Sequence, residues 1–347
     1  MKGLSVIMPV YNEAGCVSVM IDSIMAQDYA DFELIIIDDG STDGTVQVLE
    51  KYAARDGRIR LVVQEENKGV SAARNLGLEF AEGKYVAFVD ADDRIHPSMY
   101  RSLIHVLEKY GCDIAMCRIF YEYGNTGEGR EEVLPYMSQG ILGEKVCREV
   151  IGRIISNNQD FFAGIVRYVF KKEILRNSRF DTGIAYREDL LFLFDLLVSR
   201  KEIYYVDFVG YYYVRTQTSA VERYRESLFD DLMYVNNRLF SLLEKRENLE
   251  DYDRLYAMKV LQAVSLSISN LYRKDAPRRT TVDYFRQIRK FRQELEVLKE
   301  LKIDNSAVKY RPLLLLVKIR ADWAIHMIYS WKEKKRQRKY KKVTGSK

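Results

Sequence analysis

The first hundred residues alternate between short apolar runs and segments in which apolar residues recur every three or four positions. This spacing over residues 17–25, 45–49 and 71–83 predicts three helices, the third ended by Gly83. Uninterrupted apolar runs joined by helices are typical of parallel strands covered on both faces. The pattern therefore predicts an α/β fold with a mostly parallel sheet flanked by helices. The predicted strands are LSVIMPVY (4–11), FELIIID (32–38), RIRLVVQ (58–64) and KYVAFVD (84–90).

The pattern changes along the rest of the chain. Apolar spacing loosens after about residue 120, where YEYGNTGEGREE (121–132) predicts an exposed loop. A strand-like stretch returns at IYYVDFVGYYYVR (203–215), and beyond about residue 222 the spacing predicts helices. The expected regions are an α/β domain (1–220), a helical C-terminal region (221–331) and a basic tail (332–347).

The net charge of +5 is concentrated in one short segment. Residues 332–342 contain eight Lys or Arg and one Glu, so the rest of the chain sums to −2. A chain that is slightly acidic outside one segment lacks the basic surface of a nucleic-acid-binding protein. We therefore expect no nucleic-acid partner.

The cysteines, histidines and hydropathy indicate the compartment. The four cysteines form no C-x-x-C pair, and the three histidines are too scattered to bind zinc. The opening MKGLSVIMPVYNE is unlike a signal peptide, and no run of 18 uncharged apolar residues predicts a membrane span. We expect a cytoplasmic protein with reduced thiols.

The C-terminal segment 311–342 combines apolar bulk, Trp323, Trp331 and the basic run. An interfacial helix followed by a polybasic tail is a device for binding an anionic membrane surface. We predict peripheral attachment to the inner face of the cell membrane through this tail. The alternatives are a core helix at 313–317 and a tail that is solvated or contacts nucleic acid.

Polar side chains gather where three predicted strands end. In open α/β sheets, ligands bind beyond the carboxyl ends of the strands. Acids, an amide, hydroxyls and one aromatic ring at that edge suit a ligand with a flat base, hydroxyls and a diphosphate held through Mg²⁺ or Mn²⁺. The motifs G-x-x-x-x-G-K-[ST] and G-x-G-x-x-G are absent, which disfavours P-loop hydrolases and dinucleotide oxidoreductases. The three segments are PVYN (9–12), DDGSTDG (38–44) and DADD (90–93).

Each acidic segment also has a purely structural interpretation. In DDGSTDG, Thr42 or Asp43 could cap the following helix; the segment faintly resembles a calcium loop but lacks the acid at every other position and the closing glutamate. In DADD, Asp92 or Asp93 could cap a helix that starts at Pro97. The acids of YREDLLF could be favoured by the dipole of a helix N-terminus.

Four motifs together resemble the inverting family-2 glycosyltransferases of the GT-A fold, most of all the bacterial enzymes that build surface polysaccharides. The resemblance covers about residues 4–220 and is strongest in the first hundred. The motifs are VIMPVYNE, LIIIDDGSTDGT, NKGVSAARNLGLEFAEGKYVAFVDADD and YREDLLF.

The resemblance implies roles for particular residues. Tyr11 would stack on the nucleotide base and Asp39 would hydrogen-bond to it, while Asp189 would be the catalytic base beside Glu188. The full set implied by the resemblance is Pro9, Tyr11, Glu13, Asp39, Arg74, Asp90 and Ala91 for the nucleotide, with Asp90 towards the ribose; Asp92 for Mn²⁺ or Mg²⁺; and Glu188 and Asp189 for catalysis.

Two departures concern the acceptor and the late part of the site. Tyr168, beside Arg167, stands where many relatives have a lysine, and Arg215 and Ser219 match a motif that could close over the diphosphate or could be surface residues. The Q-x-x-R-W signature of processive synthases is absent, so we expect one sugar per encounter.

The expected function is metal-dependent inverting transfer of one sugar from a nucleotide-diphosphate sugar, with a UDP-sugar favoured. The acceptor would be a hydroxyl of a saccharide or lipid-linked saccharide, in the synthesis of cell-surface polysaccharide. The alternatives are a sugar-phosphate nucleotidyltransferase and a non-catalytic nucleotide-sugar-binding protein.

Overall fold

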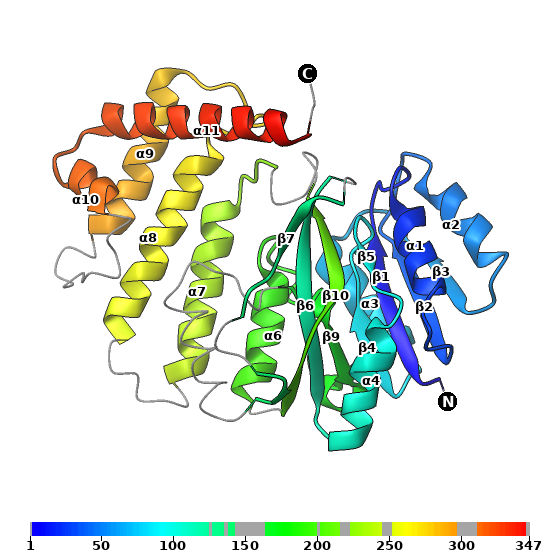
Figure 1. The fold of residues 1–347 in the computed structure, drawn as a ribbon. Coiled ribbons are helices and arrows are strands. Elements are labelled where there is room, and N and C mark those ends of the chain that lie inside the picture. The colour runs from blue at the N-terminus through cyan, green and yellow to red at the C-terminus, as the bar shows by residue number, and fades with distance from the viewer. Residues whose placement is uncertain are drawn as a thin grey trace. The chain divides into compact units, whose positions relative to one another are not determined.

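The computed structural model describes residues 2–124, 127–134, 138–142, 164–199, 202–215, 223–244, 252–296 and 311–344. The chain forms two compact units. The first contains Met1–Ile151 and Asp160–Arg215, and the second contains Gly152–Gln159 and Thr216–Lys347 (Figure 1).

The first unit contains a central sheet with helices packed against it (Figure 1). Its strands are β1 (Leu4–Val10), β2 (Phe32–Asp38), β3 (Ile59–Val63), β4 (Tyr85–Phe88), β5 (Arg94–Ile95), β6 (Ile114–Tyr123), β7 (Gly129–Glu131), β8 (Gly140–Ile141), β9 (Tyr168–Lys171) and β10 (Ile203–Arg215). Its helices are α1 (Val17–Met25), α2 (Thr45–Ala53), α3 (Val70–Phe80), α4 (Met99–Tyr110) and α6 (Glu188–Val198), with short 3₁₀ turns η1 (Ile165–Arg167) and η2 (Lys172–Leu175).

The sheet has the strand order β3-β2-β1-β4-β9-β6-β10-β5. Within the described residues, four of the seven neighbouring pairs in this order are parallel. Strand β9 runs antiparallel to both β4 and β6, so it separates two parallel parts of the sheet. The structure confirms the predicted α/β fold with a mostly parallel sheet.

Burial explains why the predicted strands form. Every residue of β1, β2 and β4 is buried, as expected for apolar strands covered on both faces. Helix α3 packs on β1 and β2 at Gly77, where a Cβ atom would lie 2.4 Å from Ile7 Cγ2. The absence of a side chain at this residue lets the helix approach the sheet closely.

Two predicted details are wrong. Helix α3 ends at Phe80 and not at Gly83, because Ala81 already has an extended backbone; the N–H of Gly83 donates a hydrogen bond to Ser5 Oγ of β1 (2.8 Å). The predicted loop at 121–132 begins with the end of β6 and includes β7, which pairs with β6 as an antiparallel hairpin. All three residues of β7 are exposed, so the sequence of this strand has no apolar pattern.

The second unit is helical within its described residues, as predicted (Figure 1). Its helices are α7 (Leu228–Glu244), α8 (Tyr252–Asn270), α9 (Thr281–Glu296), α10 (Arg311–Lys318) and α11 (Asp322–Thr344). Helix α8 packs against α7 and α9, and α11 packs against α8, α9 and α10. The basic run that we predicted as a tail from residue 332 continues helix α11 as far as Thr344. No helix in the described part of the chain is both long and apolar enough to span a membrane.

Candidate functional site

The carboxyl ends of β1, β2 and β4 lie side by side. Val10 pairs with Asp38, and Ile7 pairs with Phe88, so the segments that follow these three parallel strands leave the sheet at the same edge. The N–H of Asp39 donates to the carbonyl of Val10 (2.8 Å), which holds the first two segments together. The structure therefore brings together the three polar segments predicted to form the site.

Hydrogen bonds between the first two segments fix the turn that carries Tyr11. Asn12 has a left-handed backbone conformation (φ 55°), and its Oδ1 accepts from the N–H of Thr42 (2.8 Å). In return, the N–H of Asn12 donates to Ser41 Oγ (2.9 Å). Tyr11 is 42% exposed beside this link, so its ring is accessible for stacking.

The remaining part of DDGSTDG also supports local structure. The N–H of Glu13 donates to Thr45 Oγ1 (2.9 Å), and the Asp43 carboxylate accepts from the N–H groups of Ala14 and Thr45. The N-cap residue of α2 is Gly44, which forms no side-chain cap hydrogen bond; Asp43, one residue earlier, instead accepts from the N–H of Thr45, the first residue of the helix. The motif thus stabilises the edge of the site as well as supplying Asp39.

Asp39 is buried and is surrounded by the loop between β3 and α3. One oxygen accepts from the Gln64 side chain and the N–H of Lys68 (both 2.8 Å), and the other accepts from the N–H of Gly69 (2.8 Å). A carboxylate has about four acceptor positions, so about one is left for a nucleotide base. The Lys68 and Gly69 contacts were not predicted, although NKGVSAARN was among the motifs that signalled the family. Next to this group, Asp38 is fully buried; its Oδ1 accepts from the N–H of Ser41 (2.9 Å) and its Oδ2 has no hydrogen-bond partner.

Arg74 joins the second and third parts of the site. Its Nη2 donates to Asp90 Oδ1 (3.0 Å), and its Nη1 donates to Glu188 Oε1 (2.8 Å), a residue 114 positions away in the sequence. The guanidinium also lies over the ring of Phe180, 5.3 Å from the centroid. Arg74 is 4% exposed; burial alone would lower its pKa, but the neighbouring carboxylates raise it above the usual value. The residue predicted to lie near the nucleotide therefore holds Asp90 and Glu188 in one cluster.

Glu188 and Asp189 are the first two residues of α6. Burial, followed by the charge of Glu188, raises the pKa of Asp189 to about 7, while Arg74 opposes this rise. The preceding residue, Arg187, is buried and has a left-handed backbone (φ 67°). Such strain in a residue other than glycine is found most often at functional sites. Both interpretations of these acids are compatible. The two residues stand in the first turn of a helix, where the dipole favours acids, and a carboxylate with a pKa near 7 is suited to accept a proton.

Asp93 anchors the DADD segment to β10 and is not a helix cap. Its two oxygens accept from the Tyr211 hydroxyl and from the N–H of Val214 (both 2.7 Å). Burial, with the charges of Asp92 and Asp90, raises the pKa of Asp93 well above the usual value. Helix α4 starts later, at Met99, with no side-chain cap at its N-terminus. Tyr211 also accepts from the N–H of Asp90 (3.2 Å), so β10 fixes the segment that carries the candidate metal ligand.

Tyr168, which stands where many relatives have a lysine, and its neighbour Arg167 are buried. Arg167 forms a two-point ion pair with Glu132 (2.6 and 2.8 Å), and Tyr168 is 0% exposed in β9. The Tyr168 hydroxyl has no hydrogen-bond partner, and burial raises the pKa of this group above its usual value. Ser219 and the side chain of Arg215 lie outside the described residues.

The acids of the third segment, DADD, suit a metal ion that is bound jointly by the protein and by the phosphates of the substrate. In the part of the chain that the structure describes, no three His, Cys, Asp or Glu side chains form a group able to hold a metal ion alone. Mg²⁺ and Mn²⁺ that bind diphosphates commonly take one or two carboxylates and complete their shell with phosphate oxygens and water. Asp90 and Asp92 are both partly exposed beside buried Ala91, and they match that smaller set of ligands.

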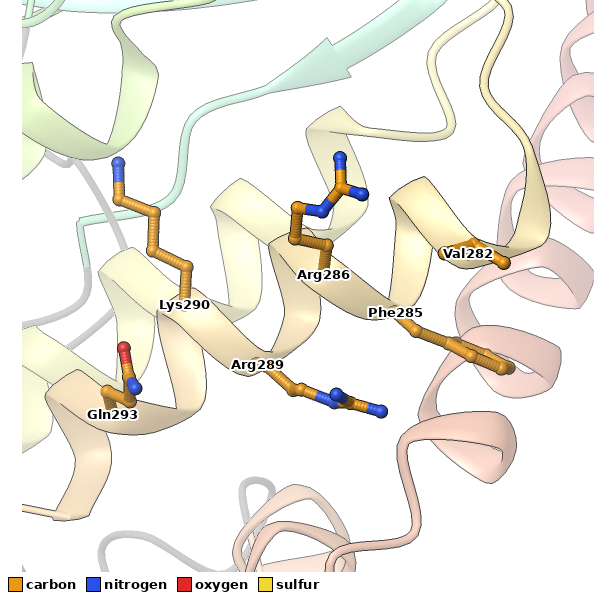
Figure 2. A pocket seen from close by; sticks show the side chains of 6 residues that line it. All are labelled: Val282, Phe285, Arg286, Arg289, Lys290 and Gln293. Atoms are coloured by element: carbon orange, nitrogen blue, oxygen red, sulfur yellow. The ribbon is translucent and has the colours of Figure 1, made fainter.

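A cavity of about 560 Å³ lies on helix α9 of the second unit (Figure 2). None of the predicted site residues lines it. Figure 2 shows the side chains that line this cavity: Val282, Phe285, Arg286, Arg289, Lys290 and Gln293.

Known proteins share the sequence and the fold. The sequence profile of "Glycosyl transferase family 2" matches residues 5–174. The chain is 30% identical over 265 residues to the glycosyltransferase YibD of Escherichia coli (strain K12), covering 74% of this chain and 73% of YibD. It is 29% identical over 204 residues to the minor teichoic acid biosynthesis protein GgaB of Bacillus subtilis (strain 168), covering 58% of this chain and 21% of GgaB. The crystal structure of S. aureus TarS 1-349 in complex with UDP-GlcNAc has a TM-score of 0.65 at 21% identity, covering 96% of this chain and 92% of the TarS 1-349 chain. The likeness to TarS agrees with the GT-A fold that the sequence motifs imply.

Proposed function

The chain belongs to glycosyl transferase family 2, and on this premise we propose that it transfers one sugar from a nucleotide-diphosphate sugar to an acceptor hydroxyl, with inversion at the anomeric carbon. The cluster in which Arg74 contacts both Asp90 and Glu188 carries the proposal. It joins the donor side of the site to the acids that would accept the acceptor's proton. A protein that only bound the nucleotide sugar would not need Asp189 in that cluster.

The donor would bind at the edge formed by β1, β2 and β4. Tyr11 would stack on the base, Asp39 would use its remaining acceptor position for a base N–H, and Asp90 would face the ribose. Pro9, near the end of β1, and Glu13 and Ala91, in the segments that follow β1 and β4, would shape this pocket. A UDP-sugar is the favoured donor, because a TarS structure of the same fold contains UDP-GlcNAc.

Catalysis would depend on the two ends of the cluster. Asp189 would take the proton of the attacking hydroxyl, for which its raised pKa is suited. Mn²⁺ or Mg²⁺ held by Asp92, with Asp90 beside it, would neutralise charge on the leaving diphosphate. Arg74 would keep Asp90 and Glu188 in place throughout the reaction.

The acceptor would be a saccharide or a lipid-linked saccharide in the synthesis of surface polysaccharide. GgaB, a teichoic acid biosynthesis protein, is among the relatives. A lipid-linked acceptor would place the enzyme at the inner face of the cell membrane. The α/β domain of about 220 residues would then carry out catalysis, and the helical region with its basic C-terminal segment would attach the enzyme to the membrane.

Calorimetry with nucleotides tests the donor site. UDP, GDP, CDP, dTDP and ADP are titrated into the wild type, with and without Mn²⁺, and into Asp92→Asn. We expect one nucleotide, UDP, to bind tightly only with Mn²⁺ and to lose at least tenfold in affinity in the variant. Asp28→Asn changes an exposed aspartate of the same unit and is the matched control. Binding that is indifferent to Mn²⁺ and to Asp92 would refute the metal-assisted mechanism.

A transfer assay separates an enzyme from a binding protein. Once the nucleotide is identified, NMR follows the release of the nucleoside diphosphate and the anomeric configuration of the product. We expect the wild type to form a product with inverted configuration and Asp189→Asn to form almost none. Nucleotide binding without transfer to any saccharide acceptor would favour the non-catalytic alternative, and release of pyrophosphate from a nucleoside triphosphate would favour a nucleotidyltransferase.

A further inference from the structure

Helix α11 has one buried side and one exposed apolar side. Ile325 is 0% exposed and Tyr329 is 5% exposed. By contrast, Trp323, Met327 and Trp331 are 67%, 62% and 60% exposed. These three residues follow each other at intervals of four and therefore share one side of the helix. We refer to Trp323, Met327 and Trp331 as the apolar stripe.

Contacts on the buried side fix the direction in which the stripe points. The Tyr329 and Ser265 hydroxyls are hydrogen-bonded (2.8 Å), and His326 Nδ1 is hydrogen-bonded to the Tyr272 hydroxyl (2.8 Å). Ser265 and Tyr272 both come from α8 and the turn that follows it. Rotation of α11 to bury the tryptophans would break both contacts, so the exposure is a stable property of this unit.

Cationic residues continue from the stripe. Lys332, Lys334 and Lys335 are exposed on the next turn, and the ammonium of Lys335 lies 5.1 Å from the centroid of the Trp331 ring. Apolar side chains extend the exposed surface at the other end, where Leu315 of α10 is 59% exposed and Ile319 is 61% exposed. Helix α10 packs against α11, so these residues belong to the same part of the unit.

We propose that the apolar stripe inserts into the interface of an anionic phospholipid bilayer while the adjacent lysines contact the headgroups. Tryptophan prefers the membrane interface, where an apolar ring meets a wet environment, and lysines near the surface are attracted by anionic lipid. The combination of exposed aromatic area and cations matches this partner better than a second protein, whose interface cores are depleted of lysine. The inference rests on the proposed function for its purpose, which is to bring the enzyme to a lipid-linked acceptor. It differs from attachment by the basic tail alone, because the tryptophans carry part of the binding.

Tryptophan fluorescence offers a direct test. The chain has two tryptophans, and both lie in the stripe, so the emission of the full chain reports on this surface alone. We expect the emission to shift to shorter wavelength with vesicles of phosphatidylglycerol and phosphatidylcholine, and to be quenched by brominated acyl chains. Vesicles of phosphatidylcholine alone should give a much smaller shift, because they offer no anionic headgroups to the lysines.

Variants separate the apolar and the charged contributions. Trp323→Ser with Trp331→Ser should lower vesicle partition at least about tenfold at both low and high salt, because apolar burial is little affected by screening. Gln in place of Lys332, Lys334 and Lys335 should lower partition about fivefold per charge at low salt and far less at high salt. Val282→Ser is the control: it removes a 64% exposed apolar side chain of α9 in the same unit and should leave vesicle partition unchanged.

Three results would overturn the inference. They are an emission spectrum that vesicles do not shift, unchanged partition of the double tryptophan variant, and a vesicle-independent dimer that this variant no longer forms. The last result would show that a second copy of the chain covers the stripe. Nucleotide binding by the same proteins distinguishes the two proposals. A stripe variant that binds UDP but not vesicles would show that the stripe serves membrane binding alone. A wild type that binds vesicles but no nucleotide would refute the proposed function.

Discussion

Replacing Asp189 by Asn should strongly slow transfer and at the same time make the folded protein more stable than the wild type above neutral pH. The amide has nearly the shape of the carboxyl group and can still accept the hydrogen bond that the N–H of Leu190 donates to Asp189 Oδ1 (2.7 Å). It cannot accept the acceptor's proton. Loss of a general base typically lowers the rate by 10²- to 10⁴-fold, and we expect a decrease of kcat of about that size.

The effect on stability follows from the pKa of Asp189, which is about 7 in the folded protein against an ordinary 3.8. A carboxyl group with a raised folded pKa contributes stability that is present below the unfolded pKa and is lost as the pH rises through the folded pKa. The wild type should therefore lose stability relative to Asp189→Asn between about pH 4 and pH 7. Allowing for partial exposure of the side chain, the difference at pH 8 should be about 2 to 4 kcal/mol.

Urea unfolding at pH 5 and pH 8 measures this difference, and the pH profile of kcat/KM measures the catalytic role. The acid limb of the wild-type profile should have its midpoint near pH 7. In Glu188→Gln the limb should move to lower pH, because the charge that raises the pKa of Asp189 is gone. The reasoning is refuted if Asp189→Asn retains activity, or if it is less stable than the wild type at pH 8.

Three further changes test the contacts around the site. Arg74→Met should move the acid limb up by about 1 to 3 pH units, because the cation that lowers the pKa of Asp189 is removed, and Arg74→Lys should restore part of the shift; identical profiles for the two variants would contradict this. Tyr211→Phe should lower the free energy of unfolding in urea by about 1 to 3 kcal/mol and weaken metal-dependent nucleotide binding, since Asp93 loses a hydrogen-bond donor. Unchanged nucleotide binding would argue against anchoring of the DADD segment by β10. Glu132→Leu should cost about 3 to 5 kcal/mol because it leaves the buried Arg167 guanidinium unpaired, whereas adding Arg167→Leu should recover part of the loss; urea unfolding of the single and double variants checks both.

The sequence predicts the fold of the first unit well where a local pattern reports a buried element. Strands β1 and β2 lie within predicted runs, and β10 coincides with the predicted stretch. The four-residue strand β9 carries too short a pattern to be detected, and its antiparallel pairing with β4 and β6 depends on contacts that no local pattern records.

The candidate site shows the same division between local and distant information. Strand ends placed Asp39 and Asp90 at one edge of the sheet, because parallel order alone determines that edge. The partners of Arg74 could not be read from the sequence, since Glu188 lies 114 positions away. The sequence alone leaves open a helix cap at Asp93, because its partner Tyr211 lies 118 positions away on β10.

The bond between Arg74 and Glu188 also limits how members of this family can be recombined. A chimera could keep the donor half, which contains Arg74, and take the following half from a relative with a different acceptor. The new half must then provide a carboxylate where Glu188 stands, because Arg74 is 4% exposed and would otherwise lose one of its two charged partners. Exchange of acceptor halves is therefore expected to succeed between parents that share this acid and to give poorly folded hybrids between parents that do not.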